Sequence, residues 1–127
     1  MTQQLVIDHV SKVFGGLKAV ADVTMTIEQG TLIALIGPNG AGKTTLFNML
    51  TGESGPSSGT ITLYTADGPV DITKKKAYQV AKLGVARTFQ NIRLFGAMTV
   101  KENVLVARTH LYRESFIGTM LRLPQFY

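Results

Sequence analysis

Nine consecutive residues have the types and the spacing needed to bind phosphate groups. Residues 37–45 read Gly-Pro-Asn-Gly-Ala-Gly-Lys-Thr-Thr, which satisfies the pattern G-x-x-x-x-G-K-[ST]. Glycines allow the backbone to form a tight turn whose N–H groups point at one anion. A helix that begins near Lys43 would add the positive end of its dipole at the same place. The pattern therefore predicts a phosphate-binding loop, provided that a buried strand precedes it and a helix follows it.

The side chains of this loop have separate expected contacts. Lys43 supplies an ammonium group for the β- and γ-phosphates, the Thr44 hydroxyl is placed to ligate Mg²⁺, and Thr45 can reach the α-phosphate. The alternative is a glycine-rich turn that joins a strand to a helix by chance, and the flanking segments argue against it. The predicted nucleotide-binding residues of the loop are Gly37, Asn39, Gly40, Ala41, Gly42, Lys43, Thr44 and Thr45.

The segments around the loop predict one strand that is covered on both faces and one antiparallel strand with a solvated face. Residues 32–36 are apolar throughout, which is typical of a strand covered by helices on both faces. Residues 20–28 alternate instead, with Val23, Met25 and Ile27 on one face and polar residues on the other, which indicates an antiparallel strand with one solvated face. Residues 5–10 are a further short strand, connected to the next by residues 11–16. After the loop, an apolar side made by Leu46, Phe47, Met49 and Leu50 predicts a helix that ends at Gly52.

Further elements follow along the chain. Residues 59–64 alternate as a strand, with Ile61 and Leu63 pointing inward, and a turn follows at residues 67–69. Thr73 is the expected cap of a helix that ends at Gly84 and buries Ala77, Val80, Ala81 and Leu83. Residues 85–89 are expected to form a short strand. Thr99 and Glu102 have the spacing of a capping box, which predicts another helix.

Composition excludes several classes of protein. Among 127 residues, 45% are apolar and 17% are charged, which permits a packed core and excludes intrinsic disorder. The absence of cysteine excludes disulfides, thiolate zinc sites and cysteine nucleophiles. The net charge of +5 suits a polyanionic nucleotide, but it is too small to predict a nucleic acid partner.

Three landmarks together resemble one family. The version Gly-Pro-Asn-Gly-Ala-Gly-Lys-Thr-Thr is similar to the Walker A loop of ATP-binding-cassette (ABC) ATPases, residues 86–90 (Ala-Arg-Thr-Phe-Gln) resemble its Q-loop, and Phe14 stands where the family places an aromatic residue against adenine. Residues 87–95 and 98–103 are very similar to the ATPase subunit of bacterial branched-chain amino-acid importers. The resemblance implies an α/β P-loop NTPase core with an antiparallel β-subdomain. Residues 1–98 would form part of the nucleotide-binding domain, and residues 99–127 would begin a helical subdomain.

The resemblance also implies roles for residues outside the loop. Phe14 would stack on the base, whereas an ordinary core or loop phenylalanine is the alternative. Gln90 would contact Mg²⁺ and the attacking water, so that Gln90 and Lys43 are the predicted catalytic residues and Thr44 and Gln90 the predicted metal contacts. Ile92, Leu94 and Phe95 would help to receive a helix from a transmembrane subunit, or else pack beneath the helix that begins at Thr99.

The family's later motifs are not found in the sequence. There is no Leu-Ser-Gly-Gly-Gln signature, no apolar strand ending in Asp-Glu and no switch histidine beyond them. We therefore expect the N-terminal half of an ATPase subunit, truncated before the helical subdomain is complete, which folds poorly alone because a bare strand edge remains.

The resemblance implies MgATP, a second ATPase subunit in a homo- or heterodimer, and permease subunits that hold the protein on the cytoplasmic side of the membrane. Alternatives are a nucleotide-binding fragment that does not hydrolyse ATP and the ATPase of a lipopolysaccharide or lipid exporter.

Overall fold

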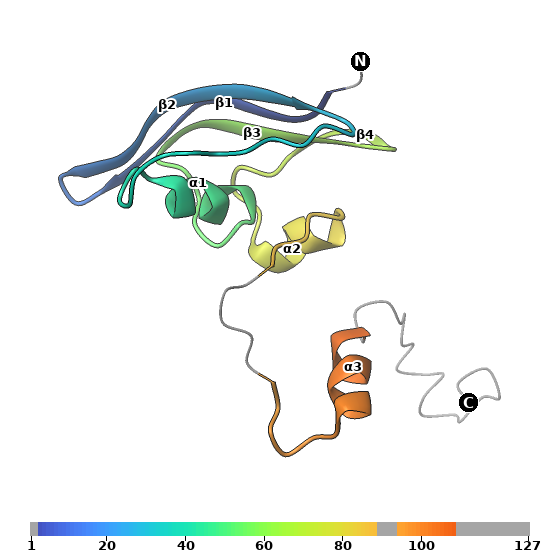
Figure 1. Ribbon diagram of the computed structural model, residues 1–127. Coiled ribbons are helices and arrows are strands. Elements are labelled where there is room, and N and C mark those ends of the chain that lie inside the picture. Colours follow the sequence, from blue (N-terminus) through green and yellow to red (C-terminus); the bar gives the residue numbers. More distant parts are fainter. Residues whose placement is uncertain (1–2, 89–93, 109–127) are drawn as a thin grey trace. The chain divides into compact units, whose positions relative to one another are not determined.

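The chain forms two compact units, Met1–Thr88 and Phe89–Tyr127. The computed structural model describes residues 3–88 and 94–108 (Figure 1). The first unit contains a sheet with two helices, and the second contains one described helix, α3 (Val100–Arg108). The predicted subdomain boundary after residue 98 refers to the resembled family, and it stays a prediction.

A four-stranded antiparallel sheet forms the first unit. Its strands are β1 (Gln3–Phe14), β2 (Leu17–Glu28), β3 (Ser58–Thr65) and β4 (Gly68–Asp71), in the order β2-β1-β3-β4. β1 extends to Phe14, so that the predicted connection over residues 11–16 is reduced to a turn at Gly15 and Gly16. Gly15 has a φ of 57°, a left-handed conformation that glycine adopts without strain.

β-Bulges change which residues of β1 and β2 face the core. Ile7 pairs with Met25 but Val10 pairs with Val23, so β1 carries one extra residue between these pairs. Between Val10 and Lys12 the extra residue lies on β2 instead, because Lys12 pairs with Val20. Ile7, Val10 and Val20 are consequently all buried, although their spacing does not follow a strict period of two. The alternation predicted for β2 is confirmed downstream of these bulges, where Thr24 and Thr26 are exposed and Val23, Met25 and Ile27 are half-buried.

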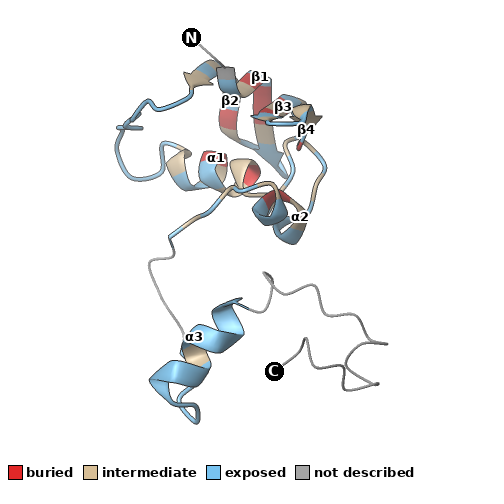
Figure 2. Ribbon diagram, turned by 90° about the vertical axis from the view of Figure 1, so that its right-hand side faces the viewer, coloured by how far each residue is buried: buried red, intermediate tan, exposed pale blue. Residues whose placement is uncertain are grey.

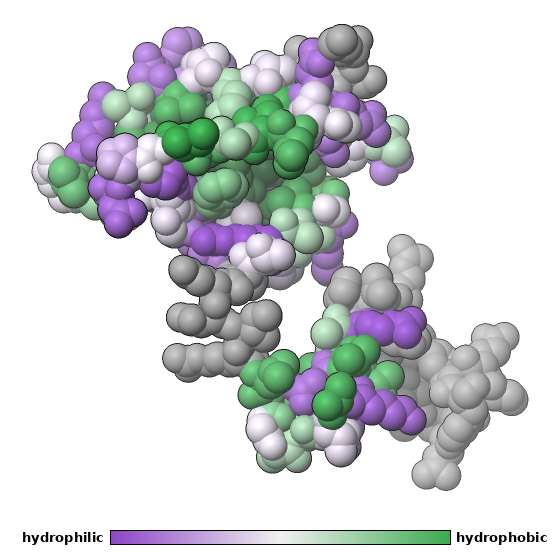
Figure 3. Space-filling model, viewed as in Figure 1, coloured by the Kyte–Doolittle hydropathy of each residue, from purple (hydrophilic) through white to green (hydrophobic). Residues whose placement is uncertain are grey.

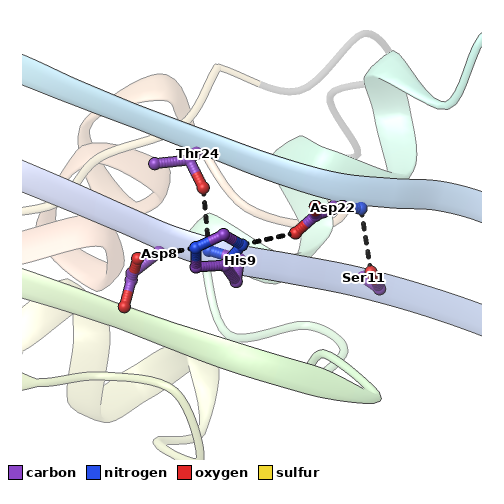
Figure 4. Close-up of polar contacts among 5 residues, drawn as sticks. All are labelled: Asp8, His9, Ser11, Asp22 and Thr24. Atoms are coloured by element: carbon purple, nitrogen blue, oxygen red, sulfur yellow. Dashed lines mark hydrogen bonds and ion pairs between the residues drawn. The ribbon is translucent and has the colours of Figure 1, made fainter.

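Polar side chains connect the two bulges on the surface of the sheet. His9 and Asp22 have positive φ values of 49° and 48°, in the left-handed region where histidine and aspartate are enriched. His9 Nδ1 lies 2.7 Å from Asp22 Oδ1, and the backbone N–H of His9 donates to Thr24 Oγ1 at 3.1 Å (Figure 4). The backbone N–H of Asp22 donates to Ser11 Oγ at 2.8 Å, so Ser11 is buried with its hydroxyl bonded. These contacts fix the geometry at which the two strands bend.

Both helices of the first unit pack on one face of the sheet. α1 (Lys43–Leu50) and α2 (Ala77–Lys82) lie beneath the curved strands in Figure 1, and the buried positions of helices and strands face one another in Figure 2. α1 begins directly after the glycine-rich loop and ends where Gly52 takes a φ of 74°, as predicted. The shared core consists of Ile7, Val10, Val20, Leu46, Met49, Ile61, Leu63, Ile72 and Val80.

The prediction that Thr73 caps α2 is wrong. The helix begins at Ala77 with Lys76 as its N-cap, whose backbone N–H donates to the Gln79 side chain at 2.9 Å. The Thr73 hydroxyl instead accepts the Ile61 N–H at 2.9 Å, and this bond ties the turn after β4 to β3. Of the residues expected to be buried by this helix, Val80 is buried, Leu83 is half-buried, and Ala77 and Ala81 are exposed.

The predicted strand over residues 32–36 is also wrong for this structure. The segment has no strand hydrogen bonding, and its apolar side chains are exposed, with Leu32 fully accessible and Ile36 at 89%. A strand needs a neighbour to pair its backbone groups, and in the part of the chain that the structure describes no strand pairs with residues 32–36. The described part of the predicted strand over residues 85–89 is irregular as well. Apolar side chains gather on the face of this unit that Figure 3 shows.

The predicted capping box in the second unit is confirmed. The Glu102 carboxylate accepts the backbone N–H of Thr99 at 2.7 Å, and Thr99 Oγ1 accepts the Glu102 N–H at 3.3 Å, directly before α3. The backbone N–H and the hydroxyl of Thr99, which donates to Glu102 Oε2 at 2.9 Å, hold the pKa of the Glu102 carboxyl below its ordinary value. Among the described residues, no helix combines the length and the apolar character needed to cross a membrane.

Candidate functional site

The glycine-rich loop folds into a tight turn directly before α1. Gly40 and Gly42 have φ values of 84° and 85°, which L-residues with a side chain rarely adopt. The backbone N–H of Ala41 donates to the Pro38 carbonyl at 3.2 Å, which closes the turn. The Leu46 N–H then donates to the Gly42 carbonyl at 2.9 Å and begins the helical hydrogen-bond pattern. The conformation is therefore the one that the two glycines were predicted to permit.

Close packing against β2 fixes the position of the loop. A Cβ atom placed on Gly42 would lie 2.3 Å from the Ala19 carbonyl oxygen and 3.2 Å from Val20 Cγ2. Real Cβ atoms essentially never make the shorter approach, so only glycine fits here. The sheet thereby positions the start of α1, and Val20 takes part both in the core and in holding the loop.

The Lys43 side chain folds back across the loop. Its Nζ atom donates to the carbonyl oxygens of Gly37 at 2.6 Å and Pro38 at 2.8 Å. No side chain caps the N-terminus of α1, and no acidic residue lies in its first turn. Because the first N–H groups of a helix have no partner within the helix, the ammonium group and the helix terminus together present positive charge to one place.

This donor set fits a magnesium-bound triphosphate. The Thr44 side chain is exposed at the second residue of α1, and Thr45 beside it is half-buried. Mg²⁺ binds oxygen ligands and typically takes several of them from substrate phosphates. The described residues contain no cluster of three histidine, cysteine or acidic side chains that could hold a metal by itself. A cation here would accordingly depend on the Thr44 hydroxyl together with phosphate oxygens.

Phe14 ends β1 close to the part of β2 that holds the loop. It pairs with Leu17, which lies two residues before Ala19 on β2, and Ala19 is the contact of Gly42. The Phe14 ring is 51% exposed, and Lys12 Nζ lies 5.1 Å from its centroid. A core phenylalanine would be buried, so that part of the alternative is wrong for Phe14. An ordinary loop phenylalanine stays an alternative, and stacking on a base stays a prediction.

A hollow of about 350 Å³ lies between β2 and the loop. Its lining includes Lys18, Ala19 and Val20 from β2, and Gly42 and Lys43 from the loop and helix. Most of its remaining lining is apolar, as is common for ligand sites in which a few polar groups fix the orientation. The predicted phosphate-binding loop therefore borders a concave surface.

Gln90 and Ile92 lie outside the described residues, and their predicted roles stay predictions. The segment leading to Gln90 is nevertheless anchored at Arg87, whose Nη1 atom donates to Asn48 Oδ1 at 2.6 Å and to Glu53 Oε2 at 3.2 Å. Asn48 belongs to α1, so Arg87 links this segment to the helix that begins at Lys43. No local pattern in the sequence indicates these contacts, because they join residues that are far apart along the chain.

The second unit contains an apolar groove of about 390 Å³ beside α3. Leu94 and Phe95 line it with Val100 and Val104, and all four side chains are more than half exposed. The backbone N–H of Phe95 donates to Asn103 Oδ1 at 3.0 Å, which holds the segment against the helix. Leu94 and Phe95 thus lie next to α3 while their side chains remain accessible.

Comparisons with known proteins identify relatives over most of the chain. Residues 20–124 match the family model described as ABC transporter. The high-affinity branched-chain amino acid transport ATP-binding protein LivG of Salmonella typhimurium is 45% identical over 113 residues, which are 89% of this chain and 43% of LivG. BraF of Pseudomonas aeruginosa, described in the same words, has the same identity and coverage. The chain therefore spans less than half the length of these curated relatives.

Solved structures agree with the predicted fold class. An ATP-binding cassette of an ABC transporter in its ADP conformation matches with a TM-score of 0.74 and 31% identity, over 98% of this chain and 47% of that one. A nucleotide-free ATP-binding cassette matches with a TM-score of 0.72 and 31% identity, over 97% of this chain and 47% of that one. These likenesses confirm the fold class, although residues 32–36 form no strand in this chain.

Proposed function

Because the chain belongs to the ABC transporter family, we propose that it forms the nucleotide-binding half of an ATPase subunit that drives the import of branched-chain amino acids. The observation that carries this proposal is the loop between Gly37 and Lys43, with its two left-handed glycines, its folded-back lysine and the uncapped helix behind it. The names of LivG and BraF support the cargo. Hydrolysis and transport are proposed for a full-length subunit of the length of these relatives, of which this chain spans less than half.

Binding follows from the groups that the loop presents. The N–H groups at the start of α1 hydrogen-bond phosphate oxygens, and the Lys43 ammonium exchanges the carbonyls of Gly37 and Pro38 for the β- and γ-phosphates. The exchange is favourable because a phosphate oxygen carries more negative charge than a carbonyl oxygen. Phe14 stacks on the base from the end of β1. A Mg²⁺ ion held by Thr44, and by Gln90 in the longer protein, would neutralise charge on the phosphates.

Catalysis in this proposal depends on positioning and charge. The attack of water on the γ-phosphate requires little covalent chemistry from the protein, so Lys43 acts by stabilising negative charge that develops during transfer. Gln90 would orient the attacking water. Arg87 fixes the chain three residues before Gln90, through its contacts with Asn48 and Glu53.

Partners complete the proposed assembly. A second ATPase subunit, identical or homologous, would bind a second nucleotide, and permease subunits would hold both on the cytoplasmic side of the membrane. The groove lined by Leu94, Phe95, Val100 and Val104 supports contact with an apolar helix of a permease, because accessible apolar patches of this kind commonly mark binding surfaces.

Substitution of the loop lysine tests the binding site. In the full-length subunit, Lys43→Ala should weaken MgATP binding about 100-fold or more in calorimetry, because a charged donor to the phosphates is lost. Lys74→Ala, at an exposed lysine in the turn before α2, serves as the matched control and should bind like the unsubstituted protein. Unchanged nucleotide affinity in Lys43→Ala would contradict the assignment.

Transport requires a separate measurement. The subunit, reconstituted with its permease and binding protein in proteoliposomes, should accumulate radiolabelled leucine when MgATP is present on the subunit's side. The Lys43→Ala complex should not accumulate leucine. ATP-dependent movement of lipopolysaccharide by the same complex, without leucine uptake, would favour the exporter and contradict the proposed cargo.

A further inference from the structure

Lys12 lies on the same face of the sheet as the nucleotide loop. Residues two apart on a strand point to the same side, and at the two register shifts between Val10 and Val13 the extra residues lie on β2 and not on β1. Val10 is fully buried against the helices, so Lys12 and Phe14 follow it on the helix-bearing face. Lys12 also pairs with Val20 of β2, whose side chain approaches Gly42 in the loop.

Two contacts hold the Lys12 ammonium in one position. Nζ donates to the Gly55 carbonyl oxygen in the connection between α1 and β3, and it lies 5.1 Å from the centroid of the Phe14 ring. A lysine ammonium within about 6 Å of an aromatic ring is attracted to the ring face. The Lys12 side chain is half-buried, whereas Phe14 is 51% exposed.

The connection that receives Lys12 is itself tied to β1. The Ser57 N–H donates to the Ser11 carbonyl at 2.8 Å, and the Val13 N–H donates to Ser57 Oγ at 3.0 Å. The Lys12 side chain therefore reaches from β1 to the Gly55 carbonyl, in a connection that other hydrogen bonds already hold against the strand. Its ammonium does not need the ring in order to stay in place, so it can act as a fixed support for the ring.

We propose that Lys12 is a positioning residue for Phe14: its ammonium covers one face of the ring, orders the ring in advance and leaves the opposite face for the adenine base. The inference rests on the proposed function, in which Phe14 stacks on that base. An ordered ring improves affinity because less side-chain conformational entropy is lost when the base binds. Lys12 thereby contributes to recognition of the base, whereas Lys43 contributes to recognition of the phosphates.

The test compares a nucleotide with a ligand that has no base. In the full-length subunit, Lys12→Met should weaken MgATP binding by about two- to fivefold in calorimetry, as expected for loss of an exposed cation–π contact. Binding of inorganic tripolyphosphate should not change, because this ligand does not reach Phe14. Lys12→Arg keeps a cation over the ring and should restore ATP affinity. In the Phe14→Ala background, Lys12→Met should have no further effect on ATP.

A control separates ring support from general loosening of the connection. Ser57→Ala removes the hydrogen bond to the Val13 N–H without touching Lys12 or the ring, and it should leave the ratio of ATP to tripolyphosphate affinity unchanged. Equal losses for both ligands in Lys12→Met, or additive losses with Phe14→Ala, would overturn the role of Lys12. Neither result would affect the Lys43→Ala test of the proposed function, so the two failures can be told apart.

Discussion

The segments on the two sides of the glycine-rich loop have very different structures. After the loop, residues 43–50 form a helix whose inner side chains Leu46 and Met49 are buried at 5% and 1% exposure. Before the loop, residues 32–36 are at least as apolar, yet they form no strand and Leu32 is fully exposed. The difference follows from where each element finds its hydrogen bonds. A helix satisfies its own backbone, whereas a strand depends on neighbours that can lie far away in the sequence.

The largest expected effect concerns the backbone of residues 32–36. The relatives are more than twice as long as this chain, and we expect the segment to pair as a strand in the full-length protein. Amide exchange of residues 32–36, measured by mass spectrometry, should then be slower there than in the 127-residue chain by about a thousandfold or more. Residues 46–50 should differ far less between the two chains. Equally fast exchange at residues 32–36 in both would contradict the expected strand.

One substitution in each of the two segments should have very different effects on the free energy of unfolding. Met49→Ala should lower the free energy of unfolding by about 2–4 kcal/mol, because a buried side chain is removed and a cavity is left. Leu32→Ala should change it by less than about 0.5 kcal/mol in the 127-residue chain, where the side chain is fully exposed. Urea unfolding of both variants gives the two values. A large loss for Leu32→Ala would show that the segment packs in solution.

The two glycines of the loop provide a closely matched experiment at the junction between the segments. Gly42→Ala should lower the free energy of unfolding by about 2 kcal/mol or more, since it adds a close approach to Ala19 to the strain of a φ of 85°. Gly40→Ala carries a nearly equal φ of 84° but has nothing within 4 Å, so it should cost only about 1 kcal/mol. Thermal unfolding of both variants would give the difference. Equal losses would mean that the packing against β2 does not position the loop.

Elements with local determinants could be predicted from the sequence. α1 follows from its apolar side and from the loop before it, and the helix start at Thr99 follows from the capping pair with Glu102. The alternation of β2 predicted which of its faces points inward. The partner of β2 is β1, which lies next to it in the chain as the other strand of a hairpin. Within the candidate site, the motif predicted a tight turn directly before a helix, as the structure has it, whereas the binding of phosphate by residues 37–45 stays a prediction.

Features that depend on distant contacts could not be predicted in the same way. The bulges at His9 and Asp22 move Val10 and Val20 into register, and no local pattern encodes them. The Thr73 hydroxyl accepts a hydrogen bond from β3 and does not cap the helix that follows it. Within the site, the contact of Lys12 with the Gly55 carbonyl and the contacts of Arg87 with Asn48 and Glu53 appear only once α1 and the connection after it are placed in the fold.

The smallest expected effect concerns His9 and Asp22, two side chains on the surface of the paired strands β1 and β2. The hydrogen bond and charge of Asp22, with a lesser contribution from the charge of Asp8, raise the pKa of His9 above its ordinary value. The protonated histidine therefore stabilises the folded chain. This contribution is fully present below about pH 6.5, the ordinary histidine pKa, and it is lost as the pH rises through the higher pKa of the folded state.

Removal of the Asp22 charge should abolish most of this dependence. Both His9 and Asp22 are largely exposed, so the melting temperature of the unsubstituted chain should fall by only about one or two degrees through this pair between pH 6 and pH 8.5. Asp22→Asn should flatten the dependence, and asparagine tolerates the positive φ at this position. Titration of the His9 ring by NMR should show its pKa falling toward the ordinary value. An unchanged pKa would mean that the carboxylate of Asp8, 3.9 Å from Nε2, stabilises the protonated ring instead.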